Sequence, residues 1–155
     1  MKQKLDKLLG GFLVILLTCM VLAVLWQIFS RYILNSPNSY TEELSRYLFI
    51  WIGILGAAYA SGQQDHLAID ILQQKLNEPN RKKLRVGINL LIILFSLVVL
   101  VIGGGNLVYV NYELGQFSAA LNLPLSFVYL VIPLSGVLVI GYKVNEIVNS
   151  KKYLI

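Results

Sequence analysis

Residues 8–30 read LLGGFLVILLTCMVLAVLWQIFS and hold no Asp, Glu, Lys or Arg over their 23 positions. Three more stretches without those four residue types follow, at 47–64, 86–112 and 114–142. A hydrocarbon core of about 30 Å is crossed by roughly 20 apolar residues in a helix. The sequence therefore predicts four membrane spans, at approximately 8–30, 44–61, 86–109 and 125–142.

The overall composition agrees with an all-α integral membrane protein. Of the 155 residues, 57% are hydrophobic and only 14% are charged. A soluble domain of this length needs a much larger polar surface to cover its core. We therefore expect one membrane domain over 1–155, with four transmembrane helices and short interfacial helices in the first external and the internal segments.

The basic residues are placed unevenly around these spans. Eleven of the 13 Lys and Arg lie before the first span, between the second and third, or after the fourth, and only Arg31 and Arg46 lie on the other side. The positive-inside rule places the eleven in the cytoplasm, so both termini are expected inside. The net charge of +5 is then a topology signal, and it does not indicate a nucleic-acid partner. The basic cluster at 81–85 would meet the anionic lipids of the inner leaflet.

Cys19 is the only cysteine in the chain, which excludes an intramolecular disulfide and a dithiol redox site. The apolar run continues well past Cys19, and no small-x-small cleavage site closes it. We therefore expect the first span to be retained rather than removed as a signal peptide.

The external segment before the second span contains residues that favour the start of a helix. Residues 35–39 favour a turn, and Thr41 is the predicted N-cap, with Glu42 and Glu43 in the first helical turn. Arg46 follows Glu42 by four residues, the spacing of a helical ion pair. Two arrangements stay open: this helix lies flat on the membrane, or it continues into the second span.

The internal segment carries a different helical pattern. The segment has apolar residues spaced for a short amphipathic helix on the membrane surface: Leu67, Ile69, Leu72 and Leu76. Pro79 would end this helix.

Small residues mark two of the spans. In the second span they are spaced four apart, which favours close helix packing: Gly53, Gly56, Ala57, Ala60 and Ser61. Packing within this chain and packing on a partner are both open. In the third span the run 103–105 is Gly-Gly-Gly, which we interpret as a site of close packing or bending rather than an ion site.

The chemistry of catalysis and of ion translocation is missing from the sequence. The middles of the four spans hold no Asp, Glu, Lys, Arg or His, which proton-driven carriers usually place there. His66 is the only histidine, so a two-histidine metal site cannot form. We expect no enzyme activity, no cofactor and no metal, and we do not favour transport by this chain alone.

A motif at 35–70 resembles the small membrane subunit of TRAP (tripartite ATP-independent periplasmic) transporters. It consists of spaced polar, aromatic and small residues, followed by a histidine and an aspartate: Asn35, Pro37, Tyr40, Glu42, Glu43, Arg46, Phe49, Trp51, Gly53, Gly56, Ala57, Ala58, His66 and Asp70. Tyr40 departs from the tryptophan expected there, and Gln63-Gln64 stand where a basic residue is common. Length, four spans and internal termini fit the same family over essentially the whole chain.

The resemblance implies an accessory subunit of a transporter in the bacterial inner membrane. Such a subunit binds a large multi-span membrane subunit that carries substrate and sodium, and a soluble periplasmic protein delivers the substrate. Typical substrates are organic acids such as C4-dicarboxylates and sialic acid. The small subunit would stabilise the static part of the large one, in contact with membrane lipids.

The motif residues can also be explained without a contact to a partner subunit. Glu42, Glu43 and Arg46 either cap and support their own helix or contact the large subunit, in which case charge reversal at Glu42 or Arg46 weakens assembly or uptake. Trp51 is either an aromatic anchor at the lipid interface or a subunit contact. His66 and Asp70 fit the start of the internal helix, and a pH switch is the alternative.

Three other functions compete with the accessory subunit. A self-sufficient, homo-oligomeric small carrier or channel predicts flux from this chain alone. A membrane-embedded enzyme predicts a cluster of reactive groups at one depth, which the sequence does not contain. An assembly factor of another complex shares the composition, and only the motif at 35–70 separates it from the preferred interpretation.

Overall fold

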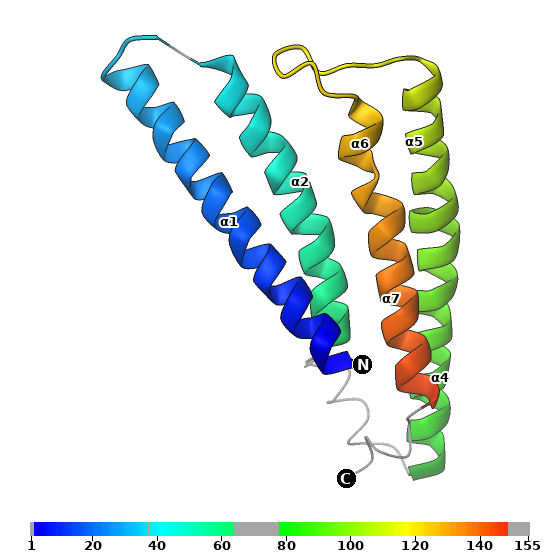
Figure 1. Cartoon of the computed structure of the whole chain (residues 1–155). Coiled ribbons are helices and arrows are strands. Elements are labelled where there is room, and N and C mark those ends of the chain that lie inside the picture. The colour runs from blue at the N-terminus through cyan, green and yellow to red at the C-terminus, as the bar shows by residue number, and fades with distance from the viewer. Residues whose placement is uncertain (1, 37, 64–77, 149–155) are drawn as a thin grey trace.

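The computed structural model describes residues 2–36, 38–63 and 78–148 (Figure 1). In this part of the chain all elements are helices, joined by loops that include one isolated bridge between Phe117 and Pro124. The elements, in order, are α1 (Lys2–Tyr32), α2 (Ser39–Gly62), α4 (Glu78–Phe95), the π-helix η1 (Ser96–Gly103), α5 (Gly104–Glu113), α6 (Leu125–Tyr129) and α7 (Val131–Val148).

Four helical stretches are long and apolar enough to cross a membrane, which confirms the predicted all-α class with four spans. They are Lys4–Tyr32, Ser39–Gly62, Lys83–Glu113 and Leu125–Val148. The third combines α4, η1 and α5 in one continuous helix, and the fourth combines α6 and α7. Each stretch contains the whole of the corresponding predicted span.

The start of α2 differs from the prediction by three residues. Asn38 is the N-cap: its backbone is extended, and its Oδ1 accepts a hydrogen bond of 3.0 Å from the Tyr40 N–H. The predicted cap, Thr41, lies inside the helix and donates its hydroxyl to the Asn38 carbonyl at 3.0 Å. Asn38 is the better cap because its short amide oxygen reaches a free N–H of the first turn. From this cap α2 runs unbroken to Gly62, so the external helix continues into the second span.

The expected internal surface helix, with its apolar residues at 67–76, lies outside the described residues, as do His66 and Asp70. The described chain resumes at Glu78, where α4 begins, and Pro79 stands in its first turn. Proline suits this position because its missing N–H would have no helical partner there.

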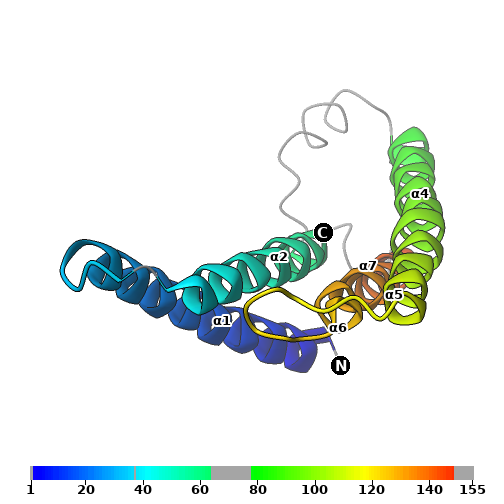
Figure 2. The same ribbon diagram turned by 90° about the horizontal axis from the view of Figure 1, so that it is seen from above.

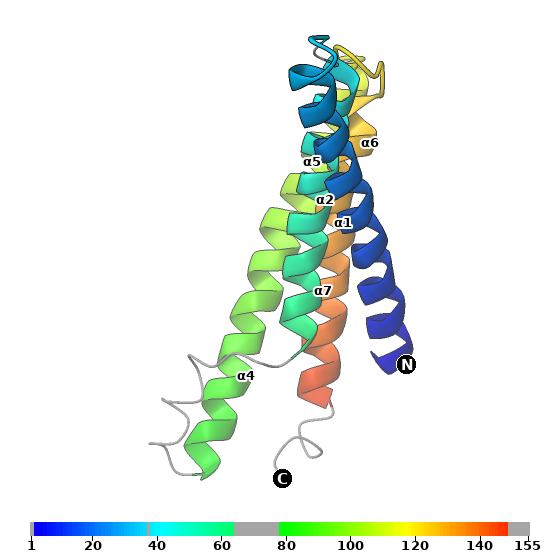
Figure 3. The same ribbon diagram turned by 90° about the vertical axis from the view of Figure 1, so that its left-hand side faces the viewer.

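The four spans form an open, bent row rather than a closed bundle (Figure 2). α1 packs along α2, α2 along α7, and α7 along α4 and η1, so the spatial order is first, second, fourth, third. The lower parts of α1 and α4 diverge to opposite sides of α7 (Figure 3). We call the end that carries residues 33–36 and the loop at 114–124 the loop end. The other end, where α1 begins and α7 ends, is the termini end.

α7 is the centre of the row because neighbouring helices come close to it at small residues. A Cβ added at Gly136 would lie 2.8 Å from Leu100 Cβ of η1. A Cβ added at Gly104 would lie 2.6 Å from Ile132 Cγ2 of α7. The glycine run at 103–105 therefore does not break the third span, and its middle residue provides close packing.

Candidate functional site

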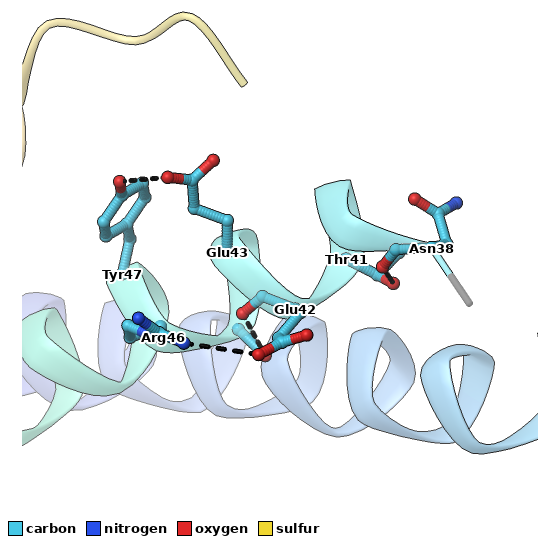
Figure 4. A network of polar contacts seen from close by, with 7 residues as sticks. Asn38, Thr41, Glu42, Glu43, Arg46 and Tyr47 are labelled. Carbon is cyan, nitrogen blue, oxygen red and sulfur yellow. Dashed lines mark hydrogen bonds and ion pairs between the residues drawn. The ribbon is translucent and has the colours of Figure 1, made fainter. Parts of the chain in front are cut away.

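The polar residues of the motif at 35–70 diverge around the start of α2 (Figure 4). Glu43 and Tyr47 lie on one side of the helix, and Glu42 and Arg46 lie on another. The predicted ion pair is present, with Arg46 Nη2 3.3 Å from Glu42 Oε1. Both of its side chains are more than half exposed, at 69% for Arg46 and 59% for Glu42. An exposed pair of this kind adds little stability.

Glu43 instead connects α2 to the loop between α5 and α6. Its Oε1 accepts the Tyr47 hydroxyl at 2.7 Å. Its Oε2 accepts the Ser118 hydroxyl at 3.0 Å and the backbone N–H groups of Ala120 and Leu121 at 2.8 and 2.9 Å. Four donors therefore compensate one carboxylate, and two of them are loop N–H groups that need a partner.

The loop itself is shaped to present those donors. Its chain turns at Gly115 and Asn122, both with φ near +50°. Ser118 N–H donates to the Leu123 carbonyl at 2.8 Å and closes the turn. The buried Ser118 hydroxyl also accepts a hydrogen bond from Leu121 N–H at 3.2 Å. The result is a compact loop held against α2 through Glu43.

Trp51 provides a second connection, about two turns further along α2 than Glu43. Its indole Nε1 donates to the Val128 carbonyl of α6 at 3.0 Å, and its ring lies 5.9 Å from that of Phe127. α6 ends at Tyr129, and α7 begins at Val131. Pro133 has no N–H to donate to the Tyr129 carbonyl four residues earlier, so the helical ladder is also incomplete beside Val128. Trp51 thus adds a donor where the fourth span is interrupted.

The termini end has its own polar contacts, all centred on α7. Tyr142 donates its hydroxyl to Asp6 Oδ1 of α1 at 2.7 Å. Lys143, only 2% exposed, lies 3.1 Å from Glu146 Oε2, and Glu146 Oε1 lies 3.8 Å from Arg85 Nε of α4. These contacts connect α7 to α1 and to α4.

Sequence reasoning identified Glu42, Glu43, Arg46 and Trp51 but did not separate their roles. It did not include Tyr47 or Ser118, although Tyr47 follows Glu43 at the helical spacing of four. It treated Lys143 only as a topology signal, and Tyr142 only as the end of a span. Gly53 is exposed and Gly56 half-buried, and neither has a neighbouring atom within 4 Å of an added Cβ.

The described residues hold no group of three His, Cys, Asp or Glu side chains that could bind a metal ion. The polar groups of the site other than the exposed pair Glu42–Arg46 fix one helix or loop to another. Fold and site together define a multi-pass helical membrane protein with a structurally fixed loop end.

Comparison with known proteins narrows this class to one family. The family model for "Tripartite ATP-independent periplasmic transporters, DctQ component" matches residues 20–151. The chain belongs to this family, and is thus a small permease subunit of a TRAP transporter and a multi-pass protein of the bacterial inner membrane.

Individual relatives agree with the family. The chain is 29% identical to the sialic acid TRAP transporter small permease protein SiaQ of Vibrio cholerae, over 87% of this chain and 77% of the relative. It is 33% identical to the C4-dicarboxylate TRAP transporter small permease protein DctQ of Rhodobacter capsulatus, over 63% of this chain and 42% of the relative. It is also 37% identical to a part of the sialic acid TRAP transporter permease protein SiaT of Haemophilus influenzae, over 58% of this chain but only 14% of the relative.

Proposed function

We propose that this chain is the scaffold subunit of a sodium-coupled, binding-protein-dependent transporter that takes up an organic acid. In this role it stabilises the static part of a larger membrane subunit, which carries the substrate and sodium sites. The observation that carries the proposal is the similarity to SiaT. In SiaT, the segment similar to this chain accounts for 14% of a longer permease polypeptide. That segment is therefore covalently joined to the rest of the permease.

The open row of helices supports a scaffold. α1 and the third span expose large apolar side chains over much of their length, and the described residues form only a small core. A row that is one helix thick has two broad faces available to lipid and to a partner. The sequence supplies no Asp, Glu, Lys, Arg or His in the middles of the spans for an ion pathway of its own.

The remaining parts of the proposal rest on the family and on the charge pattern. Relatives are named for sialic acid and for C4-dicarboxylate, both carboxylate compounds, so we propose an organic acid and leave these two as candidates. The positive-inside rule puts the termini end in the cytoplasm and the loop end in the periplasm. The loop end would then help to form the platform for the periplasmic binding protein.

Co-purification tests the scaffold role. The tagged chain is expressed with the large polytopic subunit encoded beside it, and the particle is analysed in mild detergent. We expect one stable particle with one copy of each chain. The alternative function, a self-sufficient homo-oligomeric carrier or channel, predicts that this chain runs alone as an oligomer and gives substrate flux in liposomes without the larger subunit. That result would contradict the proposal.

A further inference from the structure

One side of α2 is left uncovered by the rest of the chain. Six of its exposed residues recur at intervals of three and four, so these six share one face of the helix. The other side of α2 packs within the molecule at Leu55, Ala58 and Gly62, which are all buried. We call the uncovered side the open face of α2; it consists of Glu42, Arg46, Phe49, Gly53, Ala57 and Ala60.

The glycines on and beside the open face are not explained by packing within this chain. A Cβ added at Gly62 would lie 2.8 Å from the Tyr142 ring, so that glycine accommodates α7. A Cβ added at Gly53 or Gly56 would meet no atom within 4 Å. In a membrane, small residues favour contact because they let a second helix backbone approach closely.

The low mean hydropathy of α2, to which its small residues contribute, also favours a protein neighbour over lipid. Among the four candidate spans α2 has the lowest mean hydropathy, yet the chain buries no larger a share of it than of the third span. The exposed residues of the third span are large and apolar, such as Leu90, Leu94 and Ile102, as lipid contact requires. A span that is less apolar and still uncovered is better matched by a protein surface.

We propose that the open face of α2 seats a transmembrane helix of the larger permease subunit. That helix packs closely at Gly53 and Ala57 in the membrane. The exposed Glu42–Arg46 pair at the loop end of the same face offers it a carboxylate and a guanidinium. The inference rests on the proposed function, and the occupant is taken from SiaT, in which a segment similar to this chain is continuous with a longer permease.

The test places a bulky residue on this face and compares it with equally open glycines elsewhere. The variants are Gly53→Leu and Ala57→Leu. The controls are Gly11→Leu on α1 and Gly141→Leu on α7, where an added Cβ also meets no atom within 4 Å. Each is co-expressed with the larger subunit encoded beside this chain, and the amount of that subunit recovered on the tag is measured. Each variant is also purified alone, and its unfolding temperature is compared with that of the unmodified chain.

We expect recovery of the larger subunit to fall about tenfold or more for both open-face variants, because over-packing a close helix contact costs that much. Recovery should stay unchanged for both controls. The unfolding temperatures of the isolated open-face variants should not fall, because nothing in this chain occupies the space.

Four results would overturn the inference. Unchanged recovery for both open-face variants would do so while leaving the proposed function intact, as would an equal loss in the controls. Spontaneous disulfide-linked dimers of an Ala57→Cys, Cys19→Ser chain in membranes would assign the face to a second copy. No recovery with the unmodified chain would remove the proposed function, and the inference with it.

Discussion

At the residue scale, two adjacent glutamates have different surroundings. Glu42 pairs with Arg46 on an exposed side of α2, where solvent screens the interaction. Glu43 accepts four hydrogen bonds, three of them from residues 75 to 78 positions further along the chain. The position of each carboxylate around the helix decides whether it stabilises the fold, because only one of them faces the loop at 114–124.

Replacing Glu43 tests this difference. In Glu43→Gln one carboxylate oxygen becomes an NH2 group, which cannot accept hydrogen bonds from the donors around it. The remaining oxygen is neutral and accepts more weakly than a carboxylate oxygen. We expect the unfolding temperature of the isolated chain in detergent to fall by several degrees. Glu42→Gln is the matched control and should change it little. Equal effects of the two substitutions would mean that the contacts of Glu43 with the loop do not stabilise the protein.

At the element scale, the third span remains one helix despite three consecutive glycines. η1 ends at Gly103, and α5 begins at Gly104 without a loop between them. Only the middle glycine is needed for contact with the fourth span, since a Cβ at Gly104 would meet Ile132 and Pro133 of α7. A Cβ at Gly105 would meet no atom within 4 Å.

The two neighbouring glycines should therefore respond differently to substitution by alanine. Gly104→Ala should lower the free energy of unfolding by about 1–3 kcal/mol, the usual cost of over-packing. Gly105→Ala should leave it unchanged or raise it by up to about 1 kcal/mol, because alanine favours a helix over glycine. Denaturant titration followed by circular dichroism in one detergent measures both. A Gly104→Ala variant as stable as Gly105→Ala would show that α7 can move away at no cost.

At the scale of the whole molecule, the row of helices places the start of α1 and the end of α7 at the same end (Figure 1). Contacts between helices fix this row at both ends: Glu43 and Trp51 act at the loop end, and Tyr142 and Glu146 act at the termini end. Contacts at both ends oppose movement of the helices against one another, which suits the proposed scaffold role.

The orientation of this unit in the membrane is testable with single cysteines. Phe117 at the loop end and Lys83 near the termini end are both exposed. Each is replaced by cysteine, one at a time, in a Cys19→Ser background. A membrane-impermeant maleimide added to spheroplasts should label the first, and should label the second only after the membrane is permeabilised. The reverse pattern would contradict the predicted cytoplasmic location of both termini.

The sequence by itself determined the helical spans and the family. Transfer of a helix into lipid depends on its own side chains, so charge-free stretches such as 8–30 are sufficient to identify one. The family motif at 35–70 could also be identified from the sequence, because its residues lie within one short segment of the chain. The ion pair of Glu42 with Arg46 followed from helical spacing alone, whereas the cap was misplaced because Asn38 and Thr41 both have capping side chains.

Only the tertiary structure decided the order of helices in the row and the contacts between its ends. Glu43 contacts Ser118, which lies 75 residues further along the chain, and Asp6 contacts Tyr142, 136 residues further along. No periodicity in the sequence encodes such pairs, because they depend on which faces of separate helices pack together. For the same reason the sequence could not show that Gly104 and Gly136 are used inside the chain while Gly53 is left uncovered.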